Sequence, residues 1–446
     1  MNKKISKIIN QYSYFFENDE ILIKRNRHNS KRISIGIIVD TAFTIPPKTG
    51  VCYRLYYLSK ELFKNGINIK IFLCNRNYNN DDNINELSRE KDLEIHLIPE
   101  KIFYNLKSLF KIIKSSRVDA IQFEDSETAI LLGGYLKEKL NVPLFLELHD
   151  NETIFKKSIG GYKYSDLVLT NFVHYISGEL ADLIIITTKG DAKDFIEDVG
   201  ISSAKLVVSP NGVDPKLPYY GPNIKEKNII FIGNLFYPPN RQAMEIIFKK
   251  ILPKLSSQHF QVTFVGIAPK ELVNKYTSQN IIFTGFVNNL NRELKKATIA
   301  LCPVVAGSGM KVKILNFAAA GLPIISTTIG ANGYEDLKSI ILEDDISKYS
   351  KIIQKLRQKP NLIKEIGKQN RKDIIKYFSW SKIAKELANI YHIHITNYNR
   401  KLSFKNHELL IKKVPKPFWL TEKRVEINQN PNYYIIKNGK VNKRKL

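Results

Sequence analysis

Short runs of apolar residues alternate along the chain with longer segments in which apolar residues recur every three or four positions. The short runs are typical of buried strands, and the longer segments are typical of amphipathic helices. Buried strands are predicted first at residues 33–39, 69–73, 93–98, 120–123, 143–148, 183–187 and 206–208. The pattern restarts after Pro222, with strands predicted at residues 229–232, 261–265, 281–283, 299–302, 323–327 and 340–342. Strands that alternate with helices predict mainly parallel sheets, so we expect an α/β protein with two domains divided near residues 210–225.

The most informative segment covers residues 303–335 and reads PVVAGSGMKVKILNFAAAGLPIISTTIGANGYE. Residues 307–309 form a glycine loop whose backbone can bend closely around a ligand. Residues 310–319 then show a helical apolar pattern, and Gly321 with Pro323 should end that helix. The segment therefore predicts a strand end, a glycine loop, one helix and a further strand.

A glycine loop that leads into a helix presents free N–H groups at the positive end of the helix dipole, which favours phosphate. Lys311 and Lys313 add positive charge beside this loop. On the loop alone, an ordinary connection between a strand and a helix is about as good an interpretation.

Several segments, taken in order, resemble the group 1, family 4 retaining glycosyltransferases. Residues 307–315, GSGMKVKIL, resemble the family's nucleotide-binding loop, G-[ST]-G-x-[KR]-x-K-x-L. Residues 208–214, VSPNGVD, resemble its inter-domain signature, and residues 231–240, FIGNLFYPPN, resemble the start of its C-terminal domain. The family's order and spacing also match at residues 262–266, 283–287 and 378–380. The resemblance covers roughly residues 33–395.

The resemblance implies the GT-B fold, in which two Rossmann-like domains with mainly parallel sheets face a central cleft. The implied parts are an N-terminal lead (1–32), an acceptor domain (33–215) completed by a crossover helix (380–395), a donor-nucleotide domain (216–379) and a basic C-terminal extension (397–446).

The implied activity is transfer of a sugar from a nucleotide-sugar donor to a glycan or lipid-linked acceptor, with retention of configuration. Such a site must hold the diphosphate, stabilise its growing negative charge and position an acceptor hydroxyl. The resemblance implies a hexosyltransferase-type enzyme that needs no metal and no cofactor beyond the donor. The sequence shows no metal-ligand spacing, in agreement with that expectation.

The resemblance also assigns roles to individual residues. His149 and Asp150 follow a predicted strand and are the expected catalytic residues, close to the transferred sugar. A lone histidine usually has a structural role, but this context favours function. The residues expected to bind the donor are Gly50, Gly233, Asn234, Arg241, Val287, Ser308, Gly309, Met310, Lys311, Lys313 and Asn316.

Two of these positions depart from the family. Asn316 stands where the family usually has a glutamate that grips both ribose hydroxyls, and Asn234 stands where an arginine is common. Exchanging a charge-assisted hydrogen bond for a neutral one costs roughly 1–2 kcal/mol, or about tenfold in affinity. The departures keep open an alternative: a non-catalytic nucleotide-sugar or glycan-binding subunit of a glycan-assembly complex.

The net charge of +26 indicates an anionic partner or a lysine-rich genome. No nucleic-acid-binding motif is present, so we do not expect nucleic acid to be the partner. We expect an anionic membrane surface instead. From Lys401 onward the chain has twelve lysines and arginines against three carboxylates. This extension is either a tail packed on the surface or a membrane contact.

The remaining signals bear on location. Cys52, Cys74 and Cys302 form neither a disulfide framework nor a metal-ligand pattern. No apolar segment is long enough to span a membrane, and the N-terminus lacks a signal-peptide core. These features predict a cytoplasmic protein, peripheral on the inner face of the membrane, that acts in assembly of cell-envelope polysaccharide.

Overall fold

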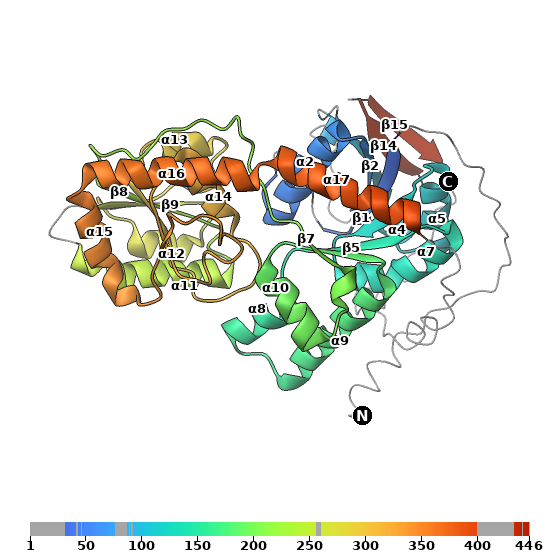
Figure 1. The fold of residues 1–446 in the computed structure, drawn as a ribbon, viewed down its shortest axis with the longest axis horizontal. Helices are drawn as coiled ribbons and strands as arrows, with labels where there is room; N and C mark the ends of the chain where they lie inside the picture. The colour runs from blue at the N-terminus through green and yellow to red at the C-terminus, as the bar shows by residue number, and fades with distance from the viewer. Residues whose placement is uncertain are drawn as a thin grey trace.

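The structure, a computed structural model, describes residues 32–41, 43–45, 47–75, 87–88, 90, 92–255, 260–398, 432–438 and 440–445. These residues form two α/β domains that lie side by side and are joined by two crossing segments (Figure 1). The predicted fold class is confirmed, because both domains contain parallel sheets. Most of the predicted N-terminal lead, and residues 399–431 of the C-terminal extension, lie outside the described residues.

In the described part of the N-terminal domain, a nine-stranded sheet has the order β15-β14-β3-β2-β1-β4-β5-β6-β7. Its strands are β1 (Ile33–Val39), β2 (Ile67–Asn75), β3 (Glu94–Pro99), β4 (Ala120–Phe123), β5 (Leu144–Leu148), β6 (Leu183–Ile186), β7 (Leu206–Val208), β14 (Asn432–Lys437) and β15 (Lys440–Lys445). Strands β1 to β7 pair in parallel, and separate apolar clusters bury the two faces of the sheet. Burial on both faces explains why these strands read as near-continuous apolar runs.

Helices cover both faces of this sheet. They include α2 (Gly50–Lys64), α4 (Glu100–Phe103), α5 (Leu106–Ser115), α6 (Ser126–Thr128), α7 (Gly134–Leu140), α8 (Glu152–Ile159), α9 (Tyr164–Leu180) and α10 (Lys189–Asp194). The side chain of Thr49 caps α2 and that of Asn151 caps α8, so both helices begin directly after a strand-end loop.

The C-terminal domain has a parallel sheet, with the order β10-β9-β8-β11-β12-β13 among the described residues. Its strands are β8 (Asn228–Ile232), β9 (Gln261–Val265), β10 (Ile281–Phe283), β11 (Ile299–Cys302), β12 (Ile324–Ser326) and β13 (Ile341–Leu342). Its helices include α11 (Pro238–Ile246), α12 (Lys270–Tyr276), α13 (Leu290–Leu294), α14 (Val312–Ala320), α15 (Tyr349–Arg357) and α16 (Pro360–Phe378). Gly321, which the sequence predicted would stop this helix, directly follows α14 and has a left-handed φ of 76°.

The chain crosses between the domains at two adjacent points. The N–H of Val213 donates to the carbonyl of Phe378 (2.7 Å), and the N–H of Trp380 donates to the carbonyl of Val213 (3.1 Å). Beyond Ser379, helix α17 (Trp380–Asn397) passes onto the N-terminal domain and packs in the same apolar cluster as α2 (Figure 1). The predicted crossover helix is therefore part of the N-terminal core.

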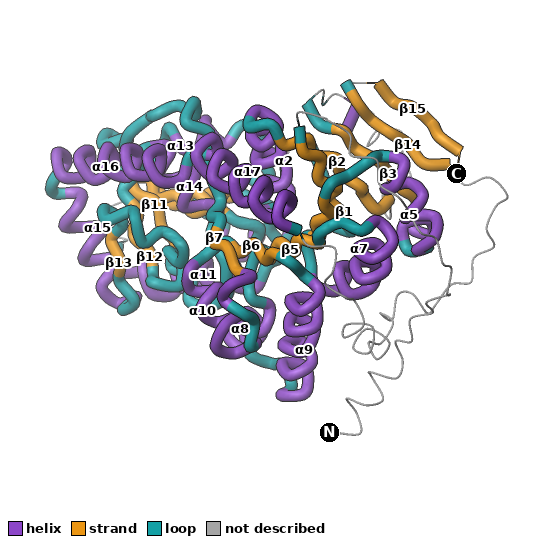
Figure 2. The backbone as a smooth tube through the Cα atoms, turned by 45° about the vertical axis from the view of Figure 1, so that its right-hand side comes forward, coloured by secondary structure: helices purple, strands orange, loops and turns teal. Residues whose placement is uncertain are grey.

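The end of the chain also belongs to that domain. Strand β14 pairs with β3 and with β15 in antiparallel register, which places the hairpin at the edge of the sheet (Figure 2). Tyr433 packs on one face of the sheet and Ile436 on the other. The prediction of a surface extension is thus corrected for these residues, because their apolar side chains complete the core.

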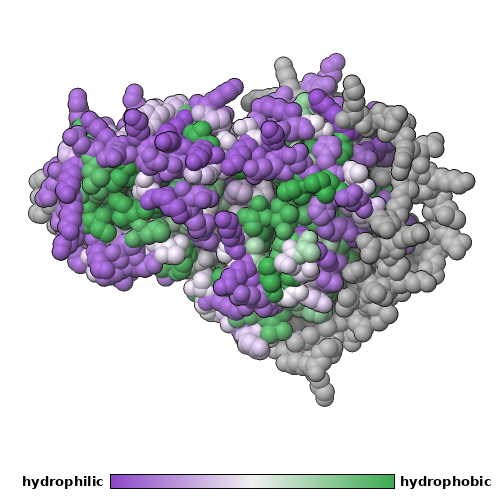
Figure 3. Space-filling model, viewed as in Figure 1, coloured by the Kyte–Doolittle hydropathy of each residue, from purple (hydrophilic) through white to green (hydrophobic). Residues whose placement is uncertain are grey.

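Polar side chains predominate along the upper edge of the face shown in Figure 3, over α16 and α17. Among the described helices, none combines the length and the apolar character that a bilayer span requires. The carboxyl ends of the parallel strands in each domain carry loops that meet between the domains, and these loops build the candidate site.

Candidate active site

The carboxyl end of β5 meets the glycine loop of the other domain. His149 and Asp150 follow β5 directly, and Gly309 packs against their backbone. A Cβ atom on Gly309 would lie 2.6 Å from the carbonyl oxygen of His149 and 2.9 Å from Cβ of Asp150. The φ of Gly309 is 70°, so its conformation also favours glycine. The structure brings the expected catalytic pair beside the expected donor loop.

Hydrogen bonds between the domains hold residues 307–310. They join Gly307 N to Ser158 Oγ (2.8 Å), Gly309 N to Asp191 Oδ1 (3.3 Å), Ser308 Oγ to Asn151 O (2.9 Å) and Asn211 N to Met310 Sδ (3.1 Å), donor first. The rings of Phe155 and Tyr237 stack across the same boundary, with centroids 5.6 Å apart. The two domains therefore meet at the glycine loop.

Two helices begin at this boundary. Helix α14 starts after Lys311 without a side-chain cap. Helix α2 starts at Gly50, where an added Cβ would lie 3.7 Å from Cγ2 of Val312. Because both N-termini carry partial positive charge, their approach favours an anion such as a diphosphate.

Lys313 supplies a cation at the same end of the C-terminal sheet. Its Nζ donates to Oδ1 of Asn240 at 2.6 Å and lies 4.1 Å from the ring centroid of Phe231. Burial lowers the pKa of Lys313 to about 8. Gly233 lies against the same asparagine, because an added Cβ would be 2.8 Å from its Cγ. Lys313, Gly233 and Asn240 thus form one group.

Three other residues that were predicted to bind the donor do not join this group. Lys311 turns back on its own loop, where Nζ donates to the carbonyls of Ser308 (2.8 Å) and Gly309 (3.0 Å). Arg241 is exposed on α11 and lies 3.8 Å from Glu271. The structure therefore does not bring Arg241 to Lys313. The side chain of Asn234 accepts from the N–H of Phe236 and orders the turn after β8.

The two residues expected near the nucleoside lie half-buried on the C-terminal domain. Asn316 is one turn after Val312 on α14, and its side chain forms no hydrogen bond with any described residue. Val287 follows Phe286, whose exposed ring lies 5.9 Å from Nζ of Lys48 in the other domain. The side chain of Val287 packs against the apolar core of the C-terminal domain.

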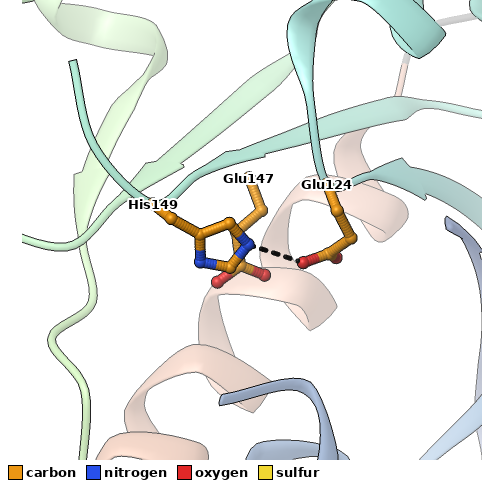
Figure 4. Close-up of side chains that lie close together, drawn as sticks. All are labelled: Glu124, Glu147 and His149. Carbon is orange, nitrogen blue, oxygen red and sulfur yellow. Dashed lines mark hydrogen bonds and ion pairs between the residues drawn. The ribbon is translucent and has the colours of Figure 1, made fainter. Parts of the chain in front are cut away.

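A buried polar network stands behind His149 (Figure 4). Nε2 of His149 lies 3.1 Å from Oε2 of Glu124, which follows β4. Nε2 of Gln122 donates to Oε1 of Glu124 at 2.9 Å and to Oε2 of Glu147 at 2.7 Å. The hydroxyl of Tyr391 on α17 donates to Oε1 of Gln122 at 2.6 Å. The crossover helix thus orients an amide that holds two carboxylates.

Arg54 completes the network from α2. Its side chain is 1% exposed and forms an ion pair with Glu147. It also donates to the carbonyl of Pro210 (2.7 Å) and to Oγ of Ser209 (3.1 Å), which lie in the segment between the domains. A buried cation must be paired, so Arg54 ties α2, β5 and the inter-domain segment together.

The network shifts the acid–base properties of its members. Burial alone would lower the pKa of His149, but the hydrogen bond and charge of Glu124 and the charge of Glu147 raise it. Burial raises the pKa of Glu147, against the effect of Arg54. Because the pKa of His149 is raised on folding, its contribution to stability is complete below about pH 6.5 and is lost as pH rises through the folded value.

Glu124, Glu147 and His149 have potential metal-ligand atoms that all lie within 4.8 Å of one another. Arg54, Gln122 and the imidazole itself already bond to the two carboxylates. A metal ion would have to displace these partners. We therefore interpret the cluster as a charge network, and metal independence stays a prediction.

Four residues at the candidate site were not predicted from the sequence: Asn240, Asp191, Glu124 and Arg54. For Glu124, the available signal was the polar residue Gln122 within the neighbouring buried strand. For Arg54, it was the position of an arginine among the apolar residues of the helix that begins at Gly50. Asp191 and Asn240 carried no such signal.

Comparisons with known proteins agree with this architecture. Residues 49–217 match the family described as Glycosyltransferase Family 4, and residues 226–359 match Glycosyl transferases group 1. The uncharacterized glycosyltransferase MJ1607 of Methanocaldococcus jannaschii is 22% identical over 80% of this chain and 98% of its own length. An Escherichia coli UDP-Gal:alpha-D-GlcNAc-diphosphoundecaprenol alpha-1,3-galactosyltransferase is 22% identical over 64% of this chain and 78% of its own.

Among solved structures, Anabaena HepE in complex with UDP and glucose superimposes with a TM-score of 0.64 and 15% identity, over 81% of this chain and all of HepE. The fold is that of a GT-B glycosyltransferase. The chain belongs to the group 1 glycosyltransferases, as its sequence motifs predicted.

Proposed function

We propose that the protein transfers a hexose from a UDP-sugar to a hydroxyl group of a lipid-diphosphate-linked glycan, with retention of configuration. The observation that carries this proposal is the contact of the glycine loop with His149 and Asp150 between two helix N-termini. The nucleotide and acceptor classes are supported by HepE, which was solved with UDP and glucose, and by the name of the E. coli relative.

In the proposed reaction, the diphosphate lies at the N-termini of α14 and α2, near Lys313. As the glycosidic bond breaks, N–H groups and the ammonium group stabilise negative charge on the leaving phosphate. The sugar lies beside His149 and Asp150. The acceptor hydroxyl attacks from the face that the phosphate leaves, and the phosphate takes the acceptor proton, so no metal or protein nucleophile is required.

The test is a transfer assay with UDP-glucose, UDP-galactose and UDP-N-acetylglucosamine, using a synthetic diphosphoundecaprenol-linked sugar as acceptor and EDTA in the buffer. We expect transfer from one of these donors, with the anomeric configuration unchanged by NMR. EDTA should not reduce the rate, because protein groups supply the positive charge. An inverted product would contradict retention, and loss of UDP binding in EDTA would contradict the metal-free mechanism.

Asn316 favours a second candidate function, a non-catalytic binding subunit. Within the same assay, Asn316→Glu should restore the two-point grip on ribose and tighten UDP binding by about tenfold. The enzyme proposal expects transfer by both forms, with the variant working at lower donor concentration. If the variant binds UDP more tightly but neither form transfers sugar, the binding subunit is the better conclusion.

We also propose a peripheral location on the cytoplasmic face of an anionic membrane, where lipid-linked acceptors would be accessible. The net charge of +26 and the exposed residues Lys440, Lys443 and Arg444 of β15 support it.

The membrane proposal predicts that changing Lys440, Lys443 and Arg444 together to glutamate will reduce flotation with phosphatidylglycerol vesicles. The contact should weaken with salt, because exposed charges are screened within about 10 Å at 0.1 M. Deleting the hairpin would uncover β3, so substitution is the cleaner test. The matched control reverses three exposed charges on α16, Lys364, Lys368 and Lys372. Equal flotation of both variants would argue against a contact through β15.

A further inference from the structure

Four residues, from β4, the loop directly after it, β5 and α2, form a buried network that is bonded to the imidazole of His149 through Glu124. Glu124 contacts Nε2 directly, and Glu147 stands behind it on β5 (Figure 4). Gln122 on β4 bonds to both carboxylates, and Arg54 on α2 pairs with Glu147. Glu124, Glu147, Gln122 and Arg54 are all at least nine-tenths buried.

When Glu124 and Glu147 are both ionised, they face one permanent cation, Arg54, and a buried negative charge remains unless His149 carries a proton. An uncompensated buried charge is costly, and protonation of His149 removes that cost.

The contact between Glu124 and Nε2 also determines which nitrogen of the His149 ring is left to face a ligand. An ionised carboxylate only accepts hydrogen bonds, so Nε2 of His149 must carry the proton that lies toward Glu124. Nδ1 is then the nitrogen left for a ligand, and it has no hydrogen-bond partner among the described residues. In the charged form, Nδ1 also carries a proton and can donate to a sugar or phosphate oxygen.

We propose that Glu124 is a positioning residue that holds His149 as an imidazolium with Nδ1–H directed to the substrate. Glu147 and Arg54 fix the charge balance behind it, and Tyr391 on the crossover helix fixes the orientation of Gln122. This proposal deepens the proposed function, since it assigns the protonation state with which His149 acts.

A second buried histidine supports the assignment by contrast. Nδ1 of His174 lies 3.1 Å from Oγ of Ser126, and no carboxylate is bonded to its ring. Burial lowers the pKa of His174 to about 4. His96 shows that one carboxylate contact is not sufficient: its Nε2 lies 3.1 Å from Oε1 of Glu94, yet burial lowers its pKa, and the charges of Lys70 and Lys437 act in the same direction. His149 differs from both histidines because two carboxylates, Glu124 and Glu147, lie close to its ring.

The test compares Glu124→Gln with the unchanged protein by NMR titration of the histidine ring protons, in the absence of donor. His149→Gln identifies the signal of His149. Because an opposite charge within a few ångströms shifts a pKa by about one unit or more, Glu124→Gln should lower the pKa of His149 by at least about one unit. The titration of His174 should not move. An unchanged pKa of His149 would overturn the proposal.

The matched control is Glu127→Gln, which removes a carboxylate from the same segment without contact to His149. It should leave the titration of His149 unchanged. If Glu124→Gln does not fold, Tyr391→Phe offers a milder change, because it keeps the ring stacked on Phe145 and removes only the bond to Gln122. We expect a smaller fall in the pKa of His149 in that variant.

Steady-state kinetics of Glu124→Gln then distinguish a positioning role of Glu124 from a general effect on the structure. Glu124→Gln should lower kcat with little change in the KM for donor, and its loss of rate with rising pH should begin at lower pH than in the unchanged protein. A proportional rise in KM would indicate a structural role and count against the proposal. If no donor is turned over but the pKa of His149 still falls, the proposed function fails while the positioning role stands.

Discussion

Replacing His149 with alanine is expected to lower kcat for sugar transfer by about 10²–10³-fold, a range typical of a lost group that moves or holds a proton. The affinity for UDP should change little. His149 lies beside Gly309 at the end of β5, on the sugar side of the loop, whereas the nucleoside is expected near Asn316 and Val287 on the other domain. Steady-state kinetics and calorimetric titration with UDP measure the two effects separately.

The alanine variant leaves Glu124 without its partner, so stability must be measured alongside activity. His149→Gln is the better-matched change, because its amide can still donate to Glu124. His392→Ala, at an exposed position on α17, controls for an unrelated loss of histidine. If kcat is unchanged in both His149 variants, the histidine has only a structural role.

The strands could be predicted from the sequence because most of them are buried on both faces of a sheet and therefore read as apolar runs. The predicted runs at residues 33–39, 120–123, 206–208, 261–265 and 299–302 coincide with strands of the structure. Local chemistry also predicted the end of α14, since Gly321 takes a positive φ at the end of that helix.

The hairpin of β14 and β15 could not be predicted from apolar runs in the sequence. Strand β15 reads KVNKRK, which has little β-propensity and no apolar alternation. Its partner β14 becomes a strand through pairing with β3, far away in the sequence. Tertiary contact, and not local preference, determines this element.

The network behind His149 was unpredictable for a similar reason. Glu147 and Arg54 are 93 positions apart, and Tyr391 is 269 positions from Gln122. Their meeting depends on the phase of α2 and on the path of α17. Arg241 and Lys313 were both predicted to supply positive charge to the donor. Which of them lies at the site depends on helix phase, because Lys313 points inward to Asn240 and Arg241 is exposed.

The second large effect is expected for Gly309→Ala, which should lower kcat/KM by about 10²-fold or more, because small displacements of reacting groups have effects of that size. The added methyl group would lie 2.6 Å from the carbonyl oxygen of His149, and a backbone atom cannot rotate away. The substitution also forces alanine into a φ of 70°. The loop and the strand end must then move apart, which separates the proposed donor site from His149.

Gly307→Ala is the matched control for backbone strain. The φ of Gly307 is 106°, so alanine is strained there too, but the nearest neighbours of an added Cβ are 3.7–3.9 Å away, at ordinary contact distance. Comparing the two variants isolates the collision between the domains. Gly309→Ala should also increase the radius of gyration measured by small-angle X-ray scattering with UDP bound, because the domains cannot close. The two variants could instead lose activity equally, with no increase in the radius of gyration of either. Backbone strain in the loop would then explain the loss, and contact of the loop with His149 would not.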